Sequence, residues 1–297
     1  MNNLNVDDWI EAGRRSFEVL NYAKTLVKED KLVIDIICEI EEYAFKKDYD
    51  FAFPPQISIN EIAAHYYPKI NDKLRVGKDD ILKIDVGIEY NGAIGDNALS
   101  VQLSKKNNDL LMASKIALET VTKELKVGMK VSEIGKIIEA TIKSLGFKPV
   151  ENLSGHGLGL YLIHCEPSIP NVNTYTRRTL DPGMAFAIEP FATNGKGEIK
   201  DSNLFATIFS LTQKEPQSQD LKEFYNYLSE SFSTLPFSYN WLLNDYNEDD
   251  LNEKLNRLER EDVIDKYPPL IEVRKGLVSQ HEYSFIVTEK EVIRITK

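Results

Sequence analysis

An Asn-Gly pair at residues 91–92 separates two strand-like segments of this chain, 81–90 and 93–103. This dipeptide between extended segments is the strongest short-range signal for a β-hairpin. A two-residue turn places Asp85 opposite Ala98 and on the same face of the hairpin as Asp96, unless a bulge shifts the register by one residue. Two carboxylates in diagonal positions lie about 7–8 Å apart at the backbone. At that separation they can converge on a pair of metal ions about 3.5–4 Å apart.

Three other residues have surroundings that suit a metal ligand. His156 lies between glycines in the segment 154–159, where the backbone can approach a ligand closely. Glu189 ends an apolar run, and a carboxylate buried there destabilises the fold by several kcal/mol unless it is paired or bound to a metal. The same argument applies to Glu282, which comes shortly before the apolar residues 285–287.

The hairpin and these segments together supply four carboxylates and one imidazole. Such a set suits two divalent cations and therefore predicts metal-assisted hydrolysis. Taken singly, each residue has another explanation, because hairpin aspartates can face water and a histidine in a glycine-rich loop is often a surface residue. The predicted metal ligands are Asp85, Asp96, His156, Glu189 and Glu282.

Composition restricts the class of protein. The chain has 297 residues, of which 42% are hydrophobic, and this suits one large domain or two smaller ones. A formal net charge of −11 argues against a DNA-binding surface. The two cysteines, Cys38 and Cys165, cannot build a disulfide framework and fit a reducing cytosol. No apolar run reaches the roughly 18–20 residues of a membrane span, and residues 1–10 lack the pattern of a secretory signal, so we expect a cytoplasmic protein.

Hydrophobic spacing predicts an α+β protein, in which strand-rich segments flank helices. Residues 152–173 show no clear periodicity. The block from about 207 to 267 is mainly helical in character and interrupts the second half of the chain, so we interpret it as an insertion. The predicted helices are 7–29, 31–46, 109–126 and 132–144, and the predicted extended segments outside the hairpin are 53–60, 184–188, 277–287 and 292–296.

Several of these segments, in this order along the chain, resemble those of the type 2 methionine aminopeptidases, in particular those of archaeal size. These enzymes are part of the pita-bread family of metallopeptidases. The resemblance implies a pseudo-two-fold, curved antiparallel sheet flanked by helices. It assigns residues 1–206 and 268–297 to a catalytic domain and residues 207–267 to a helical insertion subdomain. The matching segments are 52–54, 60–66, 83–87, 154–164, 187–191, 234–237 and 280–282.

The resemblance also implies how the five ligands act. Asp85 binds one metal with both oxygens, Asp96 and Glu282 bridge two metals, and His156 and Glu189 complete the other site. A water molecule or hydroxide between the cations is the implied nucleophile, and Glu189 is the implied proton shuttle. Oxygen-rich ligation suits manganese, iron, cobalt or zinc and does not choose among them.

Substrate contacts follow from the same resemblance. His164 is expected to donate to the developing oxyanion, and His65 to contact the substrate near the scissile amide. Phe53, Ile163 and Tyr267 are expected around an apolar pocket for the methionine side chain. The implied substrates are the N-termini of nascent polypeptides with a small second residue. A monomer is implied as well, while docking on ribosomes stays open.

The chain departs from the family pattern near one ligand. The family usually carries Phe-Glu-His where this chain has His281-Glu282-Tyr283, and Glu166 replaces a common glycine. Residues on either side of Glu282 in a strand should point away from the metals. Two alternative functions remain open: a related peptidase of the Xaa-Pro type, and a non-catalytic binding scaffold with the pita-bread fold.

Overall fold

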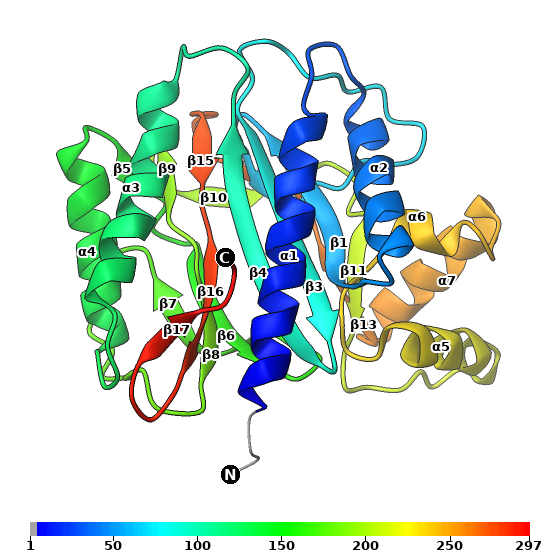
Figure 1. Cartoon of the computed structure of the whole chain (residues 1–297). Coiled ribbons are helices and arrows are strands. Elements are labelled where there is room, and N and C mark those ends of the chain that lie inside the picture. Colours follow the sequence, from blue (N-terminus) through cyan, green and yellow to red (C-terminus); the bar gives the residue numbers. More distant parts are fainter. Residues whose placement is uncertain (1–4) are drawn as a thin grey trace.

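The computed structural model describes residues 5–297 and is shown in Figure 1. Residues 1–4 of the expected catalytic domain lie outside the described residues. The helices are α1 (Val6–Leu26), α2 (Val33–Lys46), α3 (Asn108–Glu124), α4 (Val131–Ser144), α5 (Gln219–Phe232), α6 (Tyr239–Leu242) and α7 (Glu248–Arg260). Among residues 5–297, every helix falls short of the length and hydropathy that a membrane span requires.

The strands form five antiparallel sheets. The first contains β1, β3 and β4, and the five-stranded sheet has the order β17-β16-β8-β6-β7. The strands are β1 (Asp50–Ile59), β2 (Ile62–Ala64), β3 (Leu82–Tyr90), β4 (Ala93–Val101), β5 (Lys148–Pro149), β6 (Ser154–Gly159), β7 (Leu162–Pro170), β8 (Ala185–Ile188), β9 (Phe191–Thr193), β10 (Ile199–Asp201), β11 (Ile208–Leu211), β12 (Phe237–Ser238), β13 (Ile264–Tyr267), β14 (Leu270–Glu272), β15 (Val278–Gln280), β16 (Tyr283–Val287) and β17 (Val292–Arg294).

Helices and sheets are arranged in two halves of similar plan (Figure 1). In the first half, α1 and α2 pack against β1, β3 and β4, and buried side chains such as Ile36 and Ile84 form their common core. In the second half, α3 and α4 pack against the five-stranded sheet. Ile138, Phe186 and Phe285 are part of the second core formed there. The expected α+β class is confirmed.

The hairpin of β3 and β4 has the predicted register without a bulge. Asp85 pairs with Ala98, and Gly87 pairs with Asp96. Asn91 has a φ of 52° and Gly92 a φ of 85°, which are the left-handed conformations that a two-residue hairpin turn requires. Asp85 and Asp96 therefore lie on the same face of the sheet, as predicted.

The two halves join where β4 runs beside residues 280–284. The backbone N–H of Glu282 donates a 2.9 Å hydrogen bond to the carbonyl of Ala98, which forms an isolated antiparallel bridge. Next to it, the Ser284 hydroxyl accepts from the N–H of Asp96 at 3.0 Å and donates to the Asp96 carbonyl at 2.5 Å. One side chain thus satisfies both backbone groups of Asp96.

A second serine makes equivalent hydrogen bonds on the other side of this bridge. The Ser100 hydroxyl donates to the carbonyl of Gln280 at 2.9 Å and accepts from its N–H at 2.8 Å. The hydroxyls of Ser100 and Ser284 therefore replace direct strand-to-strand hydrogen bonds on either side of the Ala98–Glu282 bridge. We call this contact the seam, and it fixes the backbone of β4 relative to Glu282.

Residues 152–173, which showed no periodicity, form the hairpin of β6 and β7. Glycine occurs here because neighbouring segments of the backbone approach each other very closely. A Cβ atom on Gly155 would lie 2.3 Å from the Ala187 carbonyl oxygen, and one on Gly157 would lie 2.4 Å from that of Glu166. These glycines remove the alternating pattern by which a strand is predicted. His156 is therefore held on a strand rather than in the expected loop.

The segment 207–267 is only partly helical, which corrects the expected helical block. It contains α5, α6 and α7, but also a sheet of β12, β11 and β13. Its side chains, including Phe224, Phe237 and Leu255, form a hydrophobic cluster of their own. The sheet pairs Ile208 with Tyr267, and such distant pairing of four-residue strands has no local sequence signal.

A buried carboxylate holds together two loops near β14. Glu272 is fully buried and accepts hydrogen bonds from the backbone N–H groups of Arg274 at 2.7 Å, Gly276 at 2.9 Å, Gly197 at 3.1 Å and Lys196. Burial acts to raise the pKa of Glu272, but these donors outweigh it and lower the pKa below 4.5.

Replacing Glu272 with Gln should lower the free energy of unfolding by about 2 kcal/mol at pH 7, because charge-assisted hydrogen bonds are lost. A lowered pKa in the folded state gives stability that is present above pH 4.5 and lost as the pH falls through the folded pKa. Urea unfolding at pH 7 and at lower pH measures the difference, which should shrink in acid. Glu151→Gln, at an exposed residue nearby, is the control, and equal effects of both substitutions would contradict this role.

Candidate metal centre

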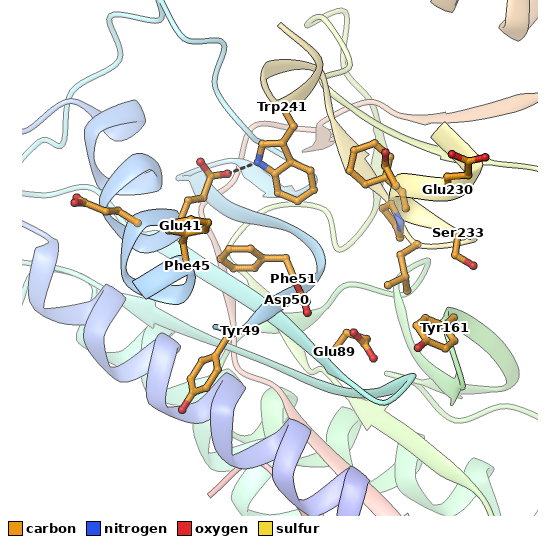
Figure 2. Close-up of a pocket in the computed structure, with 15 residues that line it drawn as sticks. Glu41, Phe45, Tyr49, Asp50, Phe51, Glu89, Tyr161, Glu230, Ser233 and Trp241 are labelled. Atoms are coloured by element: carbon orange, nitrogen blue, oxygen red, sulfur yellow. Dashed lines mark hydrogen bonds between the residues drawn. The ribbon is translucent and has the colours of Figure 1, made fainter. Parts of the chain in front are cut away.

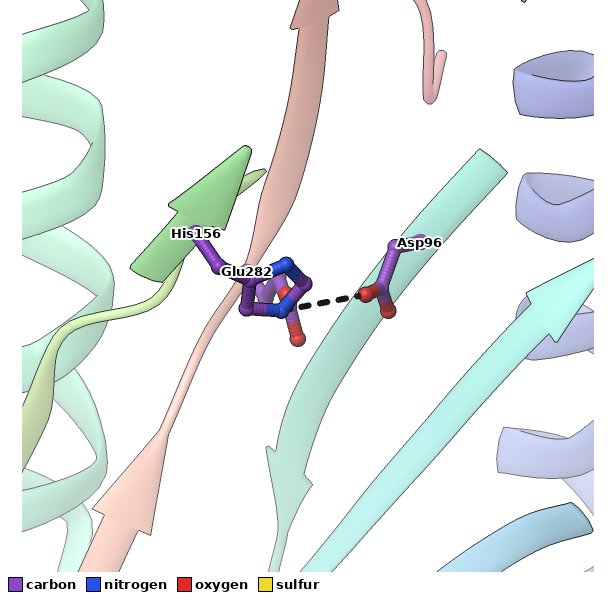
Figure 3. Close-up of side chains that lie close together, drawn as sticks. All are labelled: Asp96, His156 and Glu282. Atoms are coloured by element: carbon purple, nitrogen blue, oxygen red, sulfur yellow. Dashed lines mark ion pairs between the residues drawn. The ribbon is translucent and has the colours of Figure 1, made fainter. Parts of the chain in front are cut away.

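The five predicted ligands come from both halves and meet in one place. Asp85 lies on β3, Asp96 on β4, His156 on β6, Glu189 directly after β8, and Glu282 between β15 and β16. Figure 3 shows Asp96, His156 and Glu282, which each offer a ligand atom within 4.8 Å of the others. The Nε2 atom of His156 is 3.6 Å from Asp96 Oδ2 and 3.9 Å from Glu189 Oε1.

These carboxylates are held in an environment that disfavours their charge. Asp96 is 3% exposed and Glu282 is 1% exposed. Burial raises the pKa of both carboxyls well above the usual range, and the charges of Glu189 and other neighbouring carboxylates raise it further. Burial also raises the pKa of Asp85 to about 7. A nearby divalent cation would offset both the burial and the mutual repulsion.

The donor set fits metal ions by a direct structural test. Three buried oxygens have no hydrogen-bond partner among residues 5–297: Asp85 Oδ1, Asp96 Oδ1 and Glu282 Oε1. Buried polar atoms are nearly always paired, so three orphaned oxygens in one cluster indicate a missing positive partner. Burial lowers the pKa of His156 to about 3, which leaves the imidazole neutral and able to act as a ligand.

One neutral side chain touches three of the ligands, and the sequence prediction gave it no role. Gln280 Nε2 donates to Asp85 Oδ2 and Glu189 Oε2 at 3.3 Å and to Glu282 Oε2 at 3.4 Å. An amide donor holds carboxylates together without competing for the cation. A glutamine has no chemical signature of its own, and only its place two residues before Glu282 pointed to it.

A second amide supports the backbone of another ligand. Asn171 Nδ2 donates to the carbonyl of Glu189 at 3.1 Å and to that of Leu153 at 3.0 Å. This links β8 to the segment that precedes β6. The sequence gave no signal for this role either, because asparagine is common in loops.

The two auxiliary histidines lie beside the ligand cluster. The rings of His164 and His156 meet edge to face with centroids 4.5 Å apart, and the ring of His65 lies 5.6 Å from that of Tyr267. Burial lowers the pKa of His65 to about 4, and the pKa of His164 is lowered for the same reason. Both imidazoles are therefore neutral at pH 7 and can donate or accept a hydrogen bond.

His65 is held in an unusual backbone conformation. Its φ of 64° lies in the left-handed region, and its N–H donates to Gln56 Oε1 at 2.7 Å. Its Nδ1 atom has no hydrogen-bond partner among residues 5–297. A strained backbone and an unpaired ring nitrogen together mark a side chain that is oriented for a ligand.

All ten predicted site residues line one cavity of about 340 Å³. Phe53, Ile163 and Tyr267 form part of its apolar wall, and Ile208 and Pro236, which the sequence prediction did not include, complete that wall. The ten are Asp85, Asp96, His156, Glu189, Glu282, His65, His164, Phe53, Ile163 and Tyr267. The arrangement combines a polar cluster with an apolar recess of the size of a small-molecule site.

The two departures on either side of Glu282 lie outside this cavity. His281 packs toward α3, where its Nδ1 atom is 2.9 Å from the Ser114 hydroxyl. Tyr283 stacks against Arg294, whose guanidinium carbon lies 3.2 Å from the ring centroid. Both side chains therefore take part in packing contacts of their own, while Glu282 between them reaches the ligand cluster.

Gln280→Met should weaken metal binding about 10- to 100-fold, because supporting hydrogen bonds to metal ligands typically have effects of this size. The substitution keeps the volume of the side chain and removes the amide donor. Isothermal titration with Mn²⁺ measures the affinity. Gln213→Met, at an exposed glutamine, is the matched control and should leave it unchanged. Equal affinity of the Gln280 variant and the wild type would contradict the positioning role.

Known metallopeptidases are similar to this chain in sequence. The model of metallopeptidase family M24 matches residues 9–208. A methionine aminopeptidase of Methanocaldococcus jannaschii is 40% identical over 97% of this chain and 97% of that protein. One from Archaeoglobus fulgidus is 39% identical over 97% of each chain.

Solved structures show the same fold. A thermophilic Arx1 superposes with a TM-score of 0.87 at 16% identity, covering 99% of this chain and 91% of that one. A methionine aminopeptidase of Thermotoga maritima gives a TM-score of 0.72 at 20% identity, covering 100% and 98%. The expected pita-bread fold is thereby confirmed, and the chain belongs to metallopeptidase family M24.

Proposed function

We propose that this protein is a metal-dependent aminopeptidase that removes the N-terminal methionine from newly made polypeptides with a small second residue. The observation that carries the proposal is the group of carboxylate oxygens beside His156 that have no hydrogen-bond partner among residues 5–297. These carboxylates line the same cavity as the apolar recess. The high identity to two methionine aminopeptidases over nearly the full chain supports the choice of substrate.

We propose that Asp85, Asp96, His156, Glu189 and Glu282 hold two divalent cations. Manganese, iron, cobalt and zinc all suit this oxygen-rich set. When bound, such cations supply Lewis acidity for the scissile carbonyl and lower the pKa of water toward neutrality. Four carboxylates can balance the charge of two divalent cations, whereas one cation would leave an excess of negative charge in a buried site.

The remaining roles belong to side chains of the chain itself. During hydrolysis, Glu189 takes the proton that water releases and passes it to the leaving amine nitrogen. His164 donates an N–H to the oxygen on which negative charge develops, and His65 orients the substrate near the scissile amide. The neutral state of both histidines, which follows from their burial, suits these hydrogen-bonding roles.

The methionine side chain is proposed to occupy the apolar recess between Phe53, Ile163 and Tyr267. We propose residues 207–267 as an insertion subdomain that forms one wall of this recess, since Ile208, Pro236 and Tyr267 all line the cavity. The catalytic domain then comprises residues 1–206 and 268–297. A cytoplasmic monomer is proposed as the active form, because one chain supplies every residue of the cavity.

Activity on defined peptides tests this proposal against its alternatives. Protein loaded in turn with Mn²⁺, Fe²⁺, Co²⁺ or Zn²⁺ should release methionine from Met-Gly-Ser, and a chelator should abolish the release, which mass spectrometry detects. Peptides of the type Ala-Pro-Ser should remain intact. Cleavage of these peptides in place of Met-Gly-Ser would favour an Xaa-Pro peptidase. Two bound metals without cleavage of any Met-peptide would contradict the proposed activity.

Separate variants distinguish the auxiliary histidines from the metal ligands. His65→Ala and His164→Ala should each lower kcat about 100-fold, the effect of losing one hydrogen-bond donor to a transition state, while the metal content stays the same. Asp85→Asn is the contrasting variant and should lower the metal content itself. Elemental mass spectrometry and steady-state kinetics measure both quantities. Metal loss in either histidine variant would overturn its assigned role.

A further inference from the structure

Figure 2 shows a second cavity, which has a volume of about 730 Å³. Pro236 lines both this cavity and the catalytic cavity, so the two are neighbours. Its walls come from the end of α2, the start of β1, the end of β3, the turn between β6 and β7, and the loop after α5. We call it the lateral groove. None of the predicted site residues lines it, so its chemistry is not used by the proposed reaction.

Aromatic rings form much of this groove. Trp241 stands between Phe51 and Phe232, with ring centroids 6.2 Å and 6.0 Å away. Phe45 is 84% exposed and lies at the rim of the groove. The aromatic lining residues are Phe45, Tyr49, Phe51, Tyr161, Phe232 and Trp241.

Negative charge accompanies the rings. The groove is lined by five carboxylates and by no lysine or arginine. The Glu41 carboxylate is already engaged within the protein, because it accepts hydrogen bonds from Trp241 Nε1 at 2.8 Å and from the Tyr67 hydroxyl at 2.9 Å. Asp50 and Glu230 are exposed and form no ion pair among residues 5–297. They remain available to an incoming cation.

We propose that the lateral groove binds an extended polypeptide segment of a partner protein that is rich in arginine and lysine. Aromatic faces attract guanidinium and ammonium groups, and the adjacent carboxylates can pair with the same groups. A second copy of this chain fits poorly, because each copy has a formal net charge of −11. The charge of the groove is thus complementary to a basic partner.

The backbone around the groove favours a polypeptide over a small polycation. β1 is the edge strand of its sheet, and its first residues, Asp50 and Phe51, line the groove. An edge strand offers backbone donors and acceptors to an extended peptide. The Ser231 and Ser233 hydroxyls add further polar groups on the opposite wall. The groove therefore provides partners for both the backbone and the side chains of such a segment.

The test is a binding assay that does not depend on catalysis. A fluorescein-labelled, N-acetylated peptide of alternating Arg and Gly is the probe, and the matched peptide with Glu in place of Arg is the reference. The acetyl group removes the free amino terminus that an aminopeptidase requires. Fluorescence anisotropy with the full-length, metal-loaded protein should show at least tenfold tighter binding of the Arg peptide at low salt, weakening as salt increases.

Substitutions in the groove locate the binding. The triple variant Phe45→Ala, Asp50→Asn and Glu230→Gln should weaken Arg-peptide binding about tenfold. All three side chains are exposed, so the fold should tolerate their loss. The control is the triple variant Tyr175→Ala, Glu215→Gln and Glu289→Gln, which removes one exposed ring and two charges outside the groove and should leave binding unchanged.

Three results would overturn the proposal. Equal binding of the Arg and Glu peptides would show that the groove has no preference for a basic partner. Equal weakening in the groove and control variants would show binding through net charge alone. Displacement of the Arg peptide by an equal concentration of spermine would indicate a small-polycation site rather than a polypeptide site. Because the acetylated probe is not a substrate, each of these results is independent of whether the protein cleaves Met-peptides.

Discussion

The contact between β4 and residues 280–284 is the interaction on which the site depends. Asp96 belongs to the first half of the chain and Glu282 to the second, and the seam joins their backbones directly. The serine hydroxyls on both sides of the bridge matter because they replace a continuous ladder of backbone bonds. They let two strands meet over a short stretch and diverge beyond it, which leaves room for side chains from β6 and β8.

The seam brings together groups that repel one another. Asp85, Asp96, Glu189 and Glu282 share one buried region, and the neutral amide of Gln280 relieves only part of their repulsion. In such a site, cation binding and folding stability are thermodynamically linked, because a metal that binds the folded chain stabilises it by mass action. The site is therefore arranged for a function that a well-packed apolar core could not supply.

The sequence predicted those features whose signals are local. The register of Asp85 and Asp96 follows from the Asn-Gly turn and the two-residue period of strands, so the prediction was correct. The β6–β7 hairpin was missed because Gly155 and Gly157 remove that period, and the β11–β13 sheet was missed because its partners are distant in sequence. The contacts of Gln280 and Asn171 depend on where the fold places these side chains, and the residue type alone does not reveal that position. The roles of His65, His164 and the ligands stay predictions.

The two serine contacts of the seam join positions that are 188 and 180 residues apart, so β4 is synthesised long before its partner segment. β4 therefore stays without this partner until residues 280–284 have been synthesised. A truncated product that ends before residue 280 would contain all seven helices of residues 5–297 and still lack the segment that pairs with β4. The ligand cluster can therefore form only once this late segment is present, because the segment carries Glu282 and pairs with β4.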